Sequence, residues 1–109
     1  MSLRVTSEDF WGCELKSDSQ EFTWQCTESD ETEHKLFICQ ASLGISAKEG
    51  ERNVIEATCI NEEDGSAKSY IIVSLKQGLN ETMNLNIGFT SSVTLKLVSG
   101  SGPVHLVGS

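Results

Sequence analysis

The 109-residue sequence predicts a single all-β domain, from its composition, its short apolar segments and its turn signals. Val, Ile and Thr together number 22, whereas Ala occurs only 4 times. β-Branched side chains fit a pleated sheet and lose rotamer freedom in a helix. No segment has the 3.6-residue period of an amphipathic helix, and no apolar run approaches the roughly 18 residues of a membrane span. The length suits one domain with one hydrophobic core.

Four strands are expected in the first part of the chain. Residues 10–15 begin the ordered region with the sequence FWGCEL. Residues 21–26 alternate apolar and polar positions, which places two aromatic side chains and a cysteine on one face. Residues 35–43 contain an uninterrupted apolar run, and residues 53–60 follow a polar, Gly-containing loop. The lengths and boundaries of these segments are typical of strands in a β-sandwich or barrel.

Four more strands complete the predicted domain. Asp64-Gly65 is a hairpin signal that leads into a strand at 69–75. Residues 83–89 and 93–97 each place an apolar side chain at every second position. A tight Gly- and Pro-containing turn then precedes the last strand at 104–107. Eight short strands with regular turn signals predict a sandwich or a closed barrel.

Two of these strands are apolar at successive positions, over residues 36–39 and 70–73. A strand of a small antiparallel sandwich meets the core with one face only, so a continuous run indicates that its second face is also covered. The cover is either another subunit or a loop of the same chain, and we favour a subunit because contiguous apolar surface tends to mark interfaces. The residues assigned to this interface are Leu36, Ile38, Ile71 and Val73.

Acidic residues are concentrated in the first part of the chain. The formal net charge is −8, from 16 Asp and Glu against 8 Lys and Arg. Acidic surface repels phosphates, so direct binding of nucleic acid is not expected, and cationic partners are favoured. The alternative is that the acidic loops only keep the protein soluble and guard its strand edges. The two clusters are Glu28, Asp30, Glu31 and Glu33, and Glu62, Glu63 and Asp64.

The cysteines and a glycosylation sequon raise the alternative of a secreted, disulfide-bonded sandwich. Cys13, Cys26, Cys39 and Cys59 make an even number, and Asn80 begins an N-x-T sequon. However, each cysteine lies within an apolar strand pattern, where a free thiol behaves as a small hydrophobe. The sequence also shows no secretory leader. We therefore expect reduced thiols and an unused sequon.

Enzyme and metal chemistry find little support in the sequence. The cysteines are widely spaced, no C-x-x-C pair occurs, and only His34 and His105 could add imidazole ligands. The Gly100 to Gly102 segment leads into a strand and not a helix, so it lacks the helix N-terminus that binds phosphate. We expect no enzyme, no metal and no cofactor.

Three segments, in this order, resemble the core of the nucleoplasmin family. WGCEL at 11–15 is similar to the family's opening strand, and residues 43–56 resemble its L-G-x-x-A-K loop followed by N-V-x-E. VTLKLVSGSGPVHLVG at 93–108 resembles the family's last two strands. Together they span residues 10–108. The domain is thus taken as 10–109, with residues 1–9 a flexible N-terminus or a remnant of cloning.

The resemblance implies an eight-stranded jelly roll that assembles into a ring-shaped homopentamer, and in some members into a decamer of two stacked rings. It implies a nuclear histone chaperone, with the core histones as partners (the dimer that contains H2B, and H3–H4) and no membrane or nucleic acid bound directly. The family's acidic loop matches Glu28, Asp30, Glu31 and Glu33, which would contact the histones; Glu62, Glu63 and Asp64 are a second candidate contact, for which a solvated hairpin tip is the alternative. Stacking is implied for Ala47, Lys48 and Glu49, although Gly50 and Arg52 depart from the family pattern there. A nucleoplasmin-like oligomerising module of a larger nuclear protein is the alternative function.

Overall fold

The predicted all-β fold is confirmed by the computed structural model, which describes residues 10–25, 35–60 and 63–109. Within these ranges the chain forms eight strands, one for each predicted segment. Their bounds are β1 (Trp11–Leu15), β2 (Glu21–Trp24), β3 (Leu36–Leu43), β4 (Arg52–Ile60), β5 (Ala67–Lys76), β6 (Thr82–Phe89), β7 (Val93–Ser99) and β8 (Val104–Gly108).

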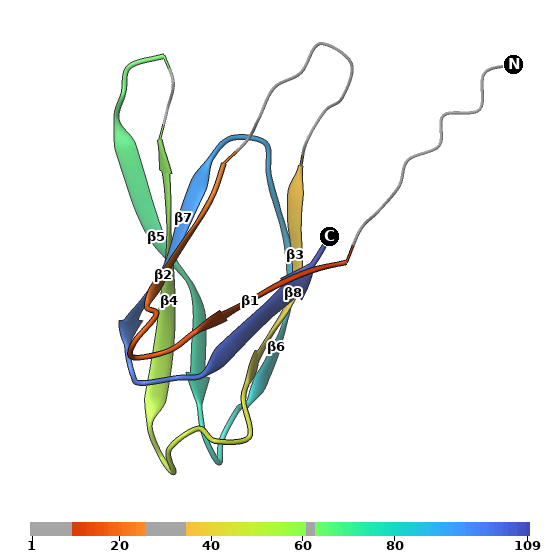
Figure 1. The fold of residues 1–109 in the computed structure, drawn as a ribbon, viewed down its shortest axis with the longest axis vertical. Helices are drawn as coiled ribbons and strands as arrows, with labels where there is room; N and C mark the ends of the chain where they lie inside the picture. Colours follow the sequence, from red (N-terminus) through yellow and green to blue (C-terminus); the bar gives the residue numbers. More distant parts are fainter. Residues whose placement is uncertain (1–9, 26–34, 61–62) are drawn as a thin grey trace, which may run out of the picture.

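The strands form two four-stranded antiparallel sheets that face each other as a sandwich (Figure 1). One sheet has the order β1-β8-β3-β6 and the other has the order β2-β7-β4-β5. Apart from the β4–β5 hairpin, neighbours in each sheet are distant in sequence, as when β8 pairs between β1 and β3, which is the strand interleaving of a jelly roll. The described residues include no helix that could cross a membrane.

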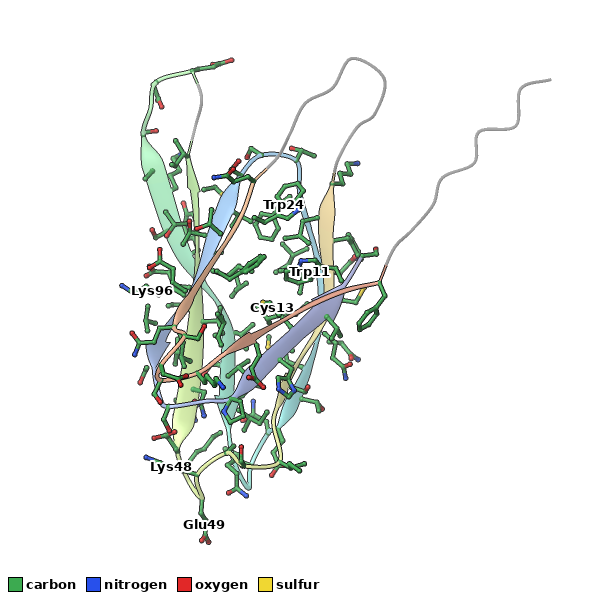
Figure 2. All side chains as sticks on the ribbon, viewed as in Figure 1. Trp11, Cys13, Trp24, Lys48, Glu49 and Lys96 are labelled. Carbon is green, nitrogen blue, oxygen red and sulfur yellow. The ribbon has the colours of Figure 1, made fainter. Side chains whose placement is uncertain are left out.

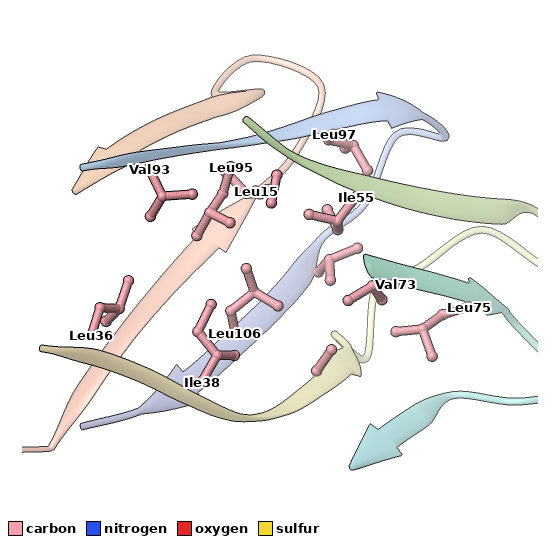
Figure 3. Packing of buried hydrophobic residues seen from close by; sticks show 13 residues of the cluster. Leu15, Leu36, Ile38, Ile55, Val73, Leu75, Val93, Leu95, Leu97 and Leu106 are labelled. Carbon is pink, nitrogen blue, oxygen red and sulfur yellow. The ribbon is translucent and has the colours of Figure 1, made fainter. Parts of the chain in front are cut away.

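The core lies between the sheets and consists of aliphatic side chains from both (Figure 3). Leu36 and Ile38 of β3 point toward Val93 and Leu95 of β7 across the sandwich (Figure 3). Trp11 of β1 and Phe22 of β2 extend this contact, with ring centroids 5.7 Å apart. Aliphatic burial of this kind is the main favourable term in folding.

The interface assigned from the sequence is corrected at three positions. Leu36, Ile38 and Val73 are only 1%, 0% and 1% exposed in a single protomer, because they face the protomer's own core. They leave no surface for a second subunit. Ile71 is 55% exposed and remains available. The outward side of the β3 run is provided by Phe37, which is partly exposed.

Two irregularities change which face the later members of these runs occupy. The register of β3 shifts between Ile38 and Gln40, so Cys39 is an extra residue on the exposed side. In β5 the register shifts between Val73 and Ile71, so Ile72 is extra there. A bulge moves the following side chains to the other face, which strict alternation along the sequence cannot anticipate.

Candidate functional site

The two ends of the sandwich differ in character, and the strands that lead into both acidic clusters end at the same one. Trp24 of β2 pairs with Val93, Val93 with Cys59, and Cys59 with Lys68, so these residues form one row across a sheet. Residues 26–34 follow this end of β2, and residues 61–66 join β4 to β5 just beyond the same row. We call this end the acidic end (Figure 1).

Most of the predicted acidic residues lie outside the described ranges. Residues 26–34 contain four carboxylates and no Lys or Arg, which accounts for half of the net charge of −8. The nine carboxylates and seven cations of the described residues are nearly balanced. The charge imbalance of the chain therefore comes mainly from segments whose flanking residues belong to the acidic end. The predicted residues that fall outside the described ranges are Glu28, Asp30, Glu31, Glu33 and Glu62.

The described part of the second cluster is a defined turn. The Asp64 carboxylate accepts hydrogen bonds from the Ser66 backbone N–H at 2.9 Å and from the Ser66 hydroxyl at 2.6 Å. These bonds lower the pKa of Asp64 below its ordinary value, with the hydroxyl bond the larger cause. Gly65 has φ of +71°, which the turn requires. Asp64 is thus a fixed, exposed negative charge, and Glu63 precedes it on the same exposed turn.

Apolar side chains lie on the hairpin just below that turn. Ile60 of β4 and Tyr70 and Ile71 of β5 are 54%, 68% and 55% exposed. β5 is an edge strand, paired along its length with β4 alone among the described strands. We call these three residues the hairpin patch, although they do not share one face: Ile71 lies opposite Glu56, whereas Tyr70 lies opposite Ala57 on the core-facing side of the sheet. An apolar edge of this length is a surface that proteins normally cover.

The opposite end, called the loop end, presents residues 44–51, 76–81 and 99–103. Lys48 and Glu49 lie at its tip and point away from the sandwich (Figure 2). Both are exposed, and neither forms an ion pair with any residue of the described ranges. Ala47 is half-buried, and its N–H donates to the Gly44 carbonyl at 3.1 Å. The structure therefore brings the three predicted stacking residues together on one projecting loop.

A polar cluster behind this loop was not predicted from the sequence. The Glu51 carboxylate accepts the Ser101 backbone N–H at 2.8 Å and the Ser101 hydroxyl at 2.5 Å. Asn53 is fully buried, and its Oδ1 accepts the Gly102 N–H at 2.8 Å. The only available signal was the polar Asn53 in phase with the core residues Ile55 and Ala57 on β4.

Among the described residues, the reactive side chains are three free thiols and one His–Glu pair. Burial raises the pKa of Cys13 to about 11, so its thiol stays protonated at neutral pH. Cys13, Cys39 and Cys59 are free thiols, and Cys26 and His34 lie outside the described residues. His105 Nε2 lies 2.7 Å from Glu14 Oε2, and this bond lowers the pKa of Glu14. The described ranges contain no group of three or more metal-ligating side chains.

The sequon asparagine has a structural role. Asn80 Nδ2 donates to the Ser74 carbonyl at 3.1 Å, and Asn80 Oδ1 accepts the Lys76 N–H at 3.2 Å. Its amide nitrogen, the atom that a glycan would occupy, thus joins β5 to the turn that follows it.

Comparison with known proteins identifies the family. The nucleoplasmin/nucleophosmin domain matches residues 8–109. Mitotic apparatus protein p62 from Lytechinus pictus is 43% identical over 95% of this chain, and nucleophosmin from Xenopus laevis is 45% identical over 90%. The chain spans 28% and 32% of the lengths of these two relatives.

A solved structure supports the same relationship. The Drosophila NLP-core crystal structure, described as giving insight into pentamer formation and histone binding, superposes with a TM-score of 0.76 at 37% identity. The match covers 94% of this chain and 97% of that one. The chain belongs to the nucleoplasmin/nucleophosmin family.

Proposed function

We propose that this domain is the oligomeric core of a nuclear histone chaperone, which binds basic histones at the acidic end of a homopentameric ring. The observation that supports it is that the described residues flanking both acidic clusters lie at one end of the sandwich. A family relative whose structure concerns pentamer formation and histone binding supports the assignment. The proposed partners are the core histones, both the dimer that contains H2B and H3–H4.

The binding is electrostatic and multivalent. A single exposed ion pair contributes only about 0–1 kcal/mol, so one acidic segment has little affinity for a histone. Five copies at −8 each give a ring of about −40, in which many weak contacts act together. Binding of this kind weakens as salt screens the charges, which allows a histone to be released to DNA. No covalent step is required.

The hairpin patch is the proposed contact between protomers. Ile60 and Ile71 are exposed on the outer face of the hairpin and Tyr70 on its other face, all beside the free edge of β5, and a protomer that covered this edge would bury them. This replaces the core residues first assigned to the interface. Stacking of two rings is assigned to the loop end, through Ala47, Lys48 and Glu49.

One experiment separates the acidic end from overall charge. In the test variant, Glu28, Asp30, Glu31 and Glu33 are changed to Gln or Asn. In the control, Asp18, Glu21, Glu56 and Glu81 are changed in the same way, so both lose four charges. Fluorescence anisotropy with the labelled dimer that contains H2B, and separately with H3–H4, measures affinity at about 0.15 M salt, where exposed charges are only partly screened.

We expect the test variant to bind about tenfold more weakly, and the control to stay near the parent. Equal losses in both variants would mean that net charge alone, rather than the acidic end, recruits histones. Unchanged binding in the test variant would remove these four residues from the site. A native mass measurement on each variant keeps ring assembly as a separate readout.

The main alternative is an oligomerising module of a larger nuclear protein. The chain spans only about a third of the relatives named above, so such a context fits. A core that forms rings but shows no salt-dependent binding to either histone pair would favour this function.

A further inference from the structure

The residues behind the loop end connect three loops that are far apart in sequence. The Glu51 carboxylate binds Ser101 in the β7–β8 turn, and the Glu51 carbonyl accepts the Gln77 N–H at 3.2 Å from the β5–β6 turn. Gln77 in return accepts the Gly50 N–H with its Oε1 at 3.2 Å. Loops 44–51, 76–81 and 99–103 are therefore held together through one residue, Glu51.

A second side chain fixes the turn from inside. Asn53 is fully buried, and its Oδ1 bonds the Gly102 N–H, which is also buried. Gly100 has φ of +90°, and a Cβ at this position would overlap the Asn53 amide. The turn thus closes tightly around the Asn53 side chain, with no room for movement between them.

The exposed part of the loop end contrasts with this fixed base. Ile45 is fully exposed and Leu79 is 73% exposed, one on each of two neighbouring loops. Lys48 and Glu49 lie at the tip with opposite charges and no ion-pair partner in the described ranges. A surface of this kind binds well only if its loops are already ordered, because ordering them on contact would cost conformational entropy.

We propose that Glu51 and Asn53 are positioning residues, which latch loop 44–51 to the 99–103 turn and so hold the loop end ready to contact the same end of a second ring. This rests on the proposed stacking of rings. Glu51 and Asn53 themselves make no contact with the second ring. The loop end presents two exposed apolar side chains and one Lys–Glu pair. Under a twofold axis such a surface is self-complementary, because Lys48 of each copy faces Glu49 of the other.

Amide hydrogen exchange tests the latch without reference to stacking. The reporters are the N–H groups of Gly50, Gln77 and Ser101, each of which has a hydrogen bond that depends on the latch. The variants are Glu51→Ala, Ser101→Ala and the pair together. Ser101→Thr keeps the hydroxyl as a conservative rescue. Ser99→Ala, an exposed serine on β7, is the matched control.

We expect several-fold faster exchange at the reporters in Glu51→Ala and Ser101→Ala, and near-parent exchange in Ser101→Thr and Ser99→Ala. The double variant should exchange little faster than Glu51→Ala, because both changes remove one shared contact. Parent-like exchange in Glu51→Ala would overturn the latch. Glu51 and Ser101 are only partly buried, so the test does not depend on whether a buried Asn53 variant folds.

Native mass spectrometry then measures the ratio of decamer to pentamer. A positioning role predicts that Glu51→Ala lowers this ratio while the pentamer and its Tm persist, and that Ser101→Thr restores it. An unchanged ratio despite faster exchange would show that the latch does not prepare the stacking surface. If the parent forms pentamers only, the proposed stacking is wrong, and the exchange data still decide whether the latch exists.

Discussion

Replacement of Asn53 by Ala tests how strongly the buried amide stabilises the fold. The change removes the acceptor of the Gly102 N–H, which is buried and has no second acceptor among the described residues. An unsatisfied buried donor costs about 1–3 kcal/mol. The emptied side-chain volume adds about 1 kcal/mol. We therefore expect the free energy of unfolding to fall by about 2–4 kcal/mol.

Urea denaturation followed by tryptophan fluorescence is a suitable assay, because Trp11 and Trp24 are partly buried against the core. All samples share one protein concentration, since assembly shifts apparent stability. Asn84→Ala, an exposed asparagine on β6, is the control and should lie within about 0.5 kcal/mol of the parent.

Asn53→Leu separates hydrogen bonding from packing. Leucine keeps the branched skeleton of four side-chain heavy atoms but accepts no hydrogen bond, so the cost of about 1–3 kcal/mol for the lost acceptor should remain. A Leu variant as stable as the parent would refute the hydrogen-bond argument. An Ala variant within about 0.5 kcal/mol of the parent would refute the structural role altogether.

Three further predictions concern single side chains. Gly100→Ala should destabilise the fold more than a typical surface change, by about 2 kcal/mol or more, because it strains a positive φ and overlaps the buried amide; urea midpoints measure this. The Ser101 bonds lower the pKa of Glu51 in the folded state, so its stabilising contribution is present above the ordinary value of 4.5 and is lost as the pH falls through the lower folded value. Glu51→Gln should lack this pH dependence in urea titrations, and an identical profile for both proteins would argue against the latch. At about pH 8 iodoacetamide should modify the exposed Cys39 well before Cys13, whose pKa is raised to about 11 by burial, and equal rates in peptide mapping would contradict the burial of Cys13.

The fold was predictable because its signals are local. Each strand has its own apolar pattern and its own turn residues, and Asp64-Gly65 forms the turn that its sequence indicates. Which residues of β3 and β5 face the core was not predictable, because a continuous apolar run does not show which of its side chains point inward. The extra residues Cys39 and Ile72 also change the phase within each strand.

The same distinction applies to the candidate site: features that are local in the sequence were predictable, and features that depend on strand pairing were not. The acidic clusters and the Lys48–Glu49 loop were evident as local runs of charge and as a motif. That the residues flanking the acidic clusters and the Lys48–Glu49 loop lie at opposite ends depends on the register of strands that are distant in sequence. The latch joins Glu51 and Ser101 across 50 positions, so no local pattern could reveal it. The hairpin patch became visible only when burial distinguished Ile71 from Val73.

Native mass spectrometry of the parent and of Ile71→Lys, at micromolar concentration, tests the central claim most directly. The parent should appear at about 60 kDa, five times the 11.9 kDa of the chain, or at twice that mass if rings stack. A lysine in the hairpin patch should shift the population to 11.9 kDa protomers, whereas Ile45→Lys at the loop end should leave the pentamer intact. A parent that stays at 11.9 kDa would contradict the ring. An Ile71→Lys variant that still forms pentamers would contradict the hairpin patch as its interface.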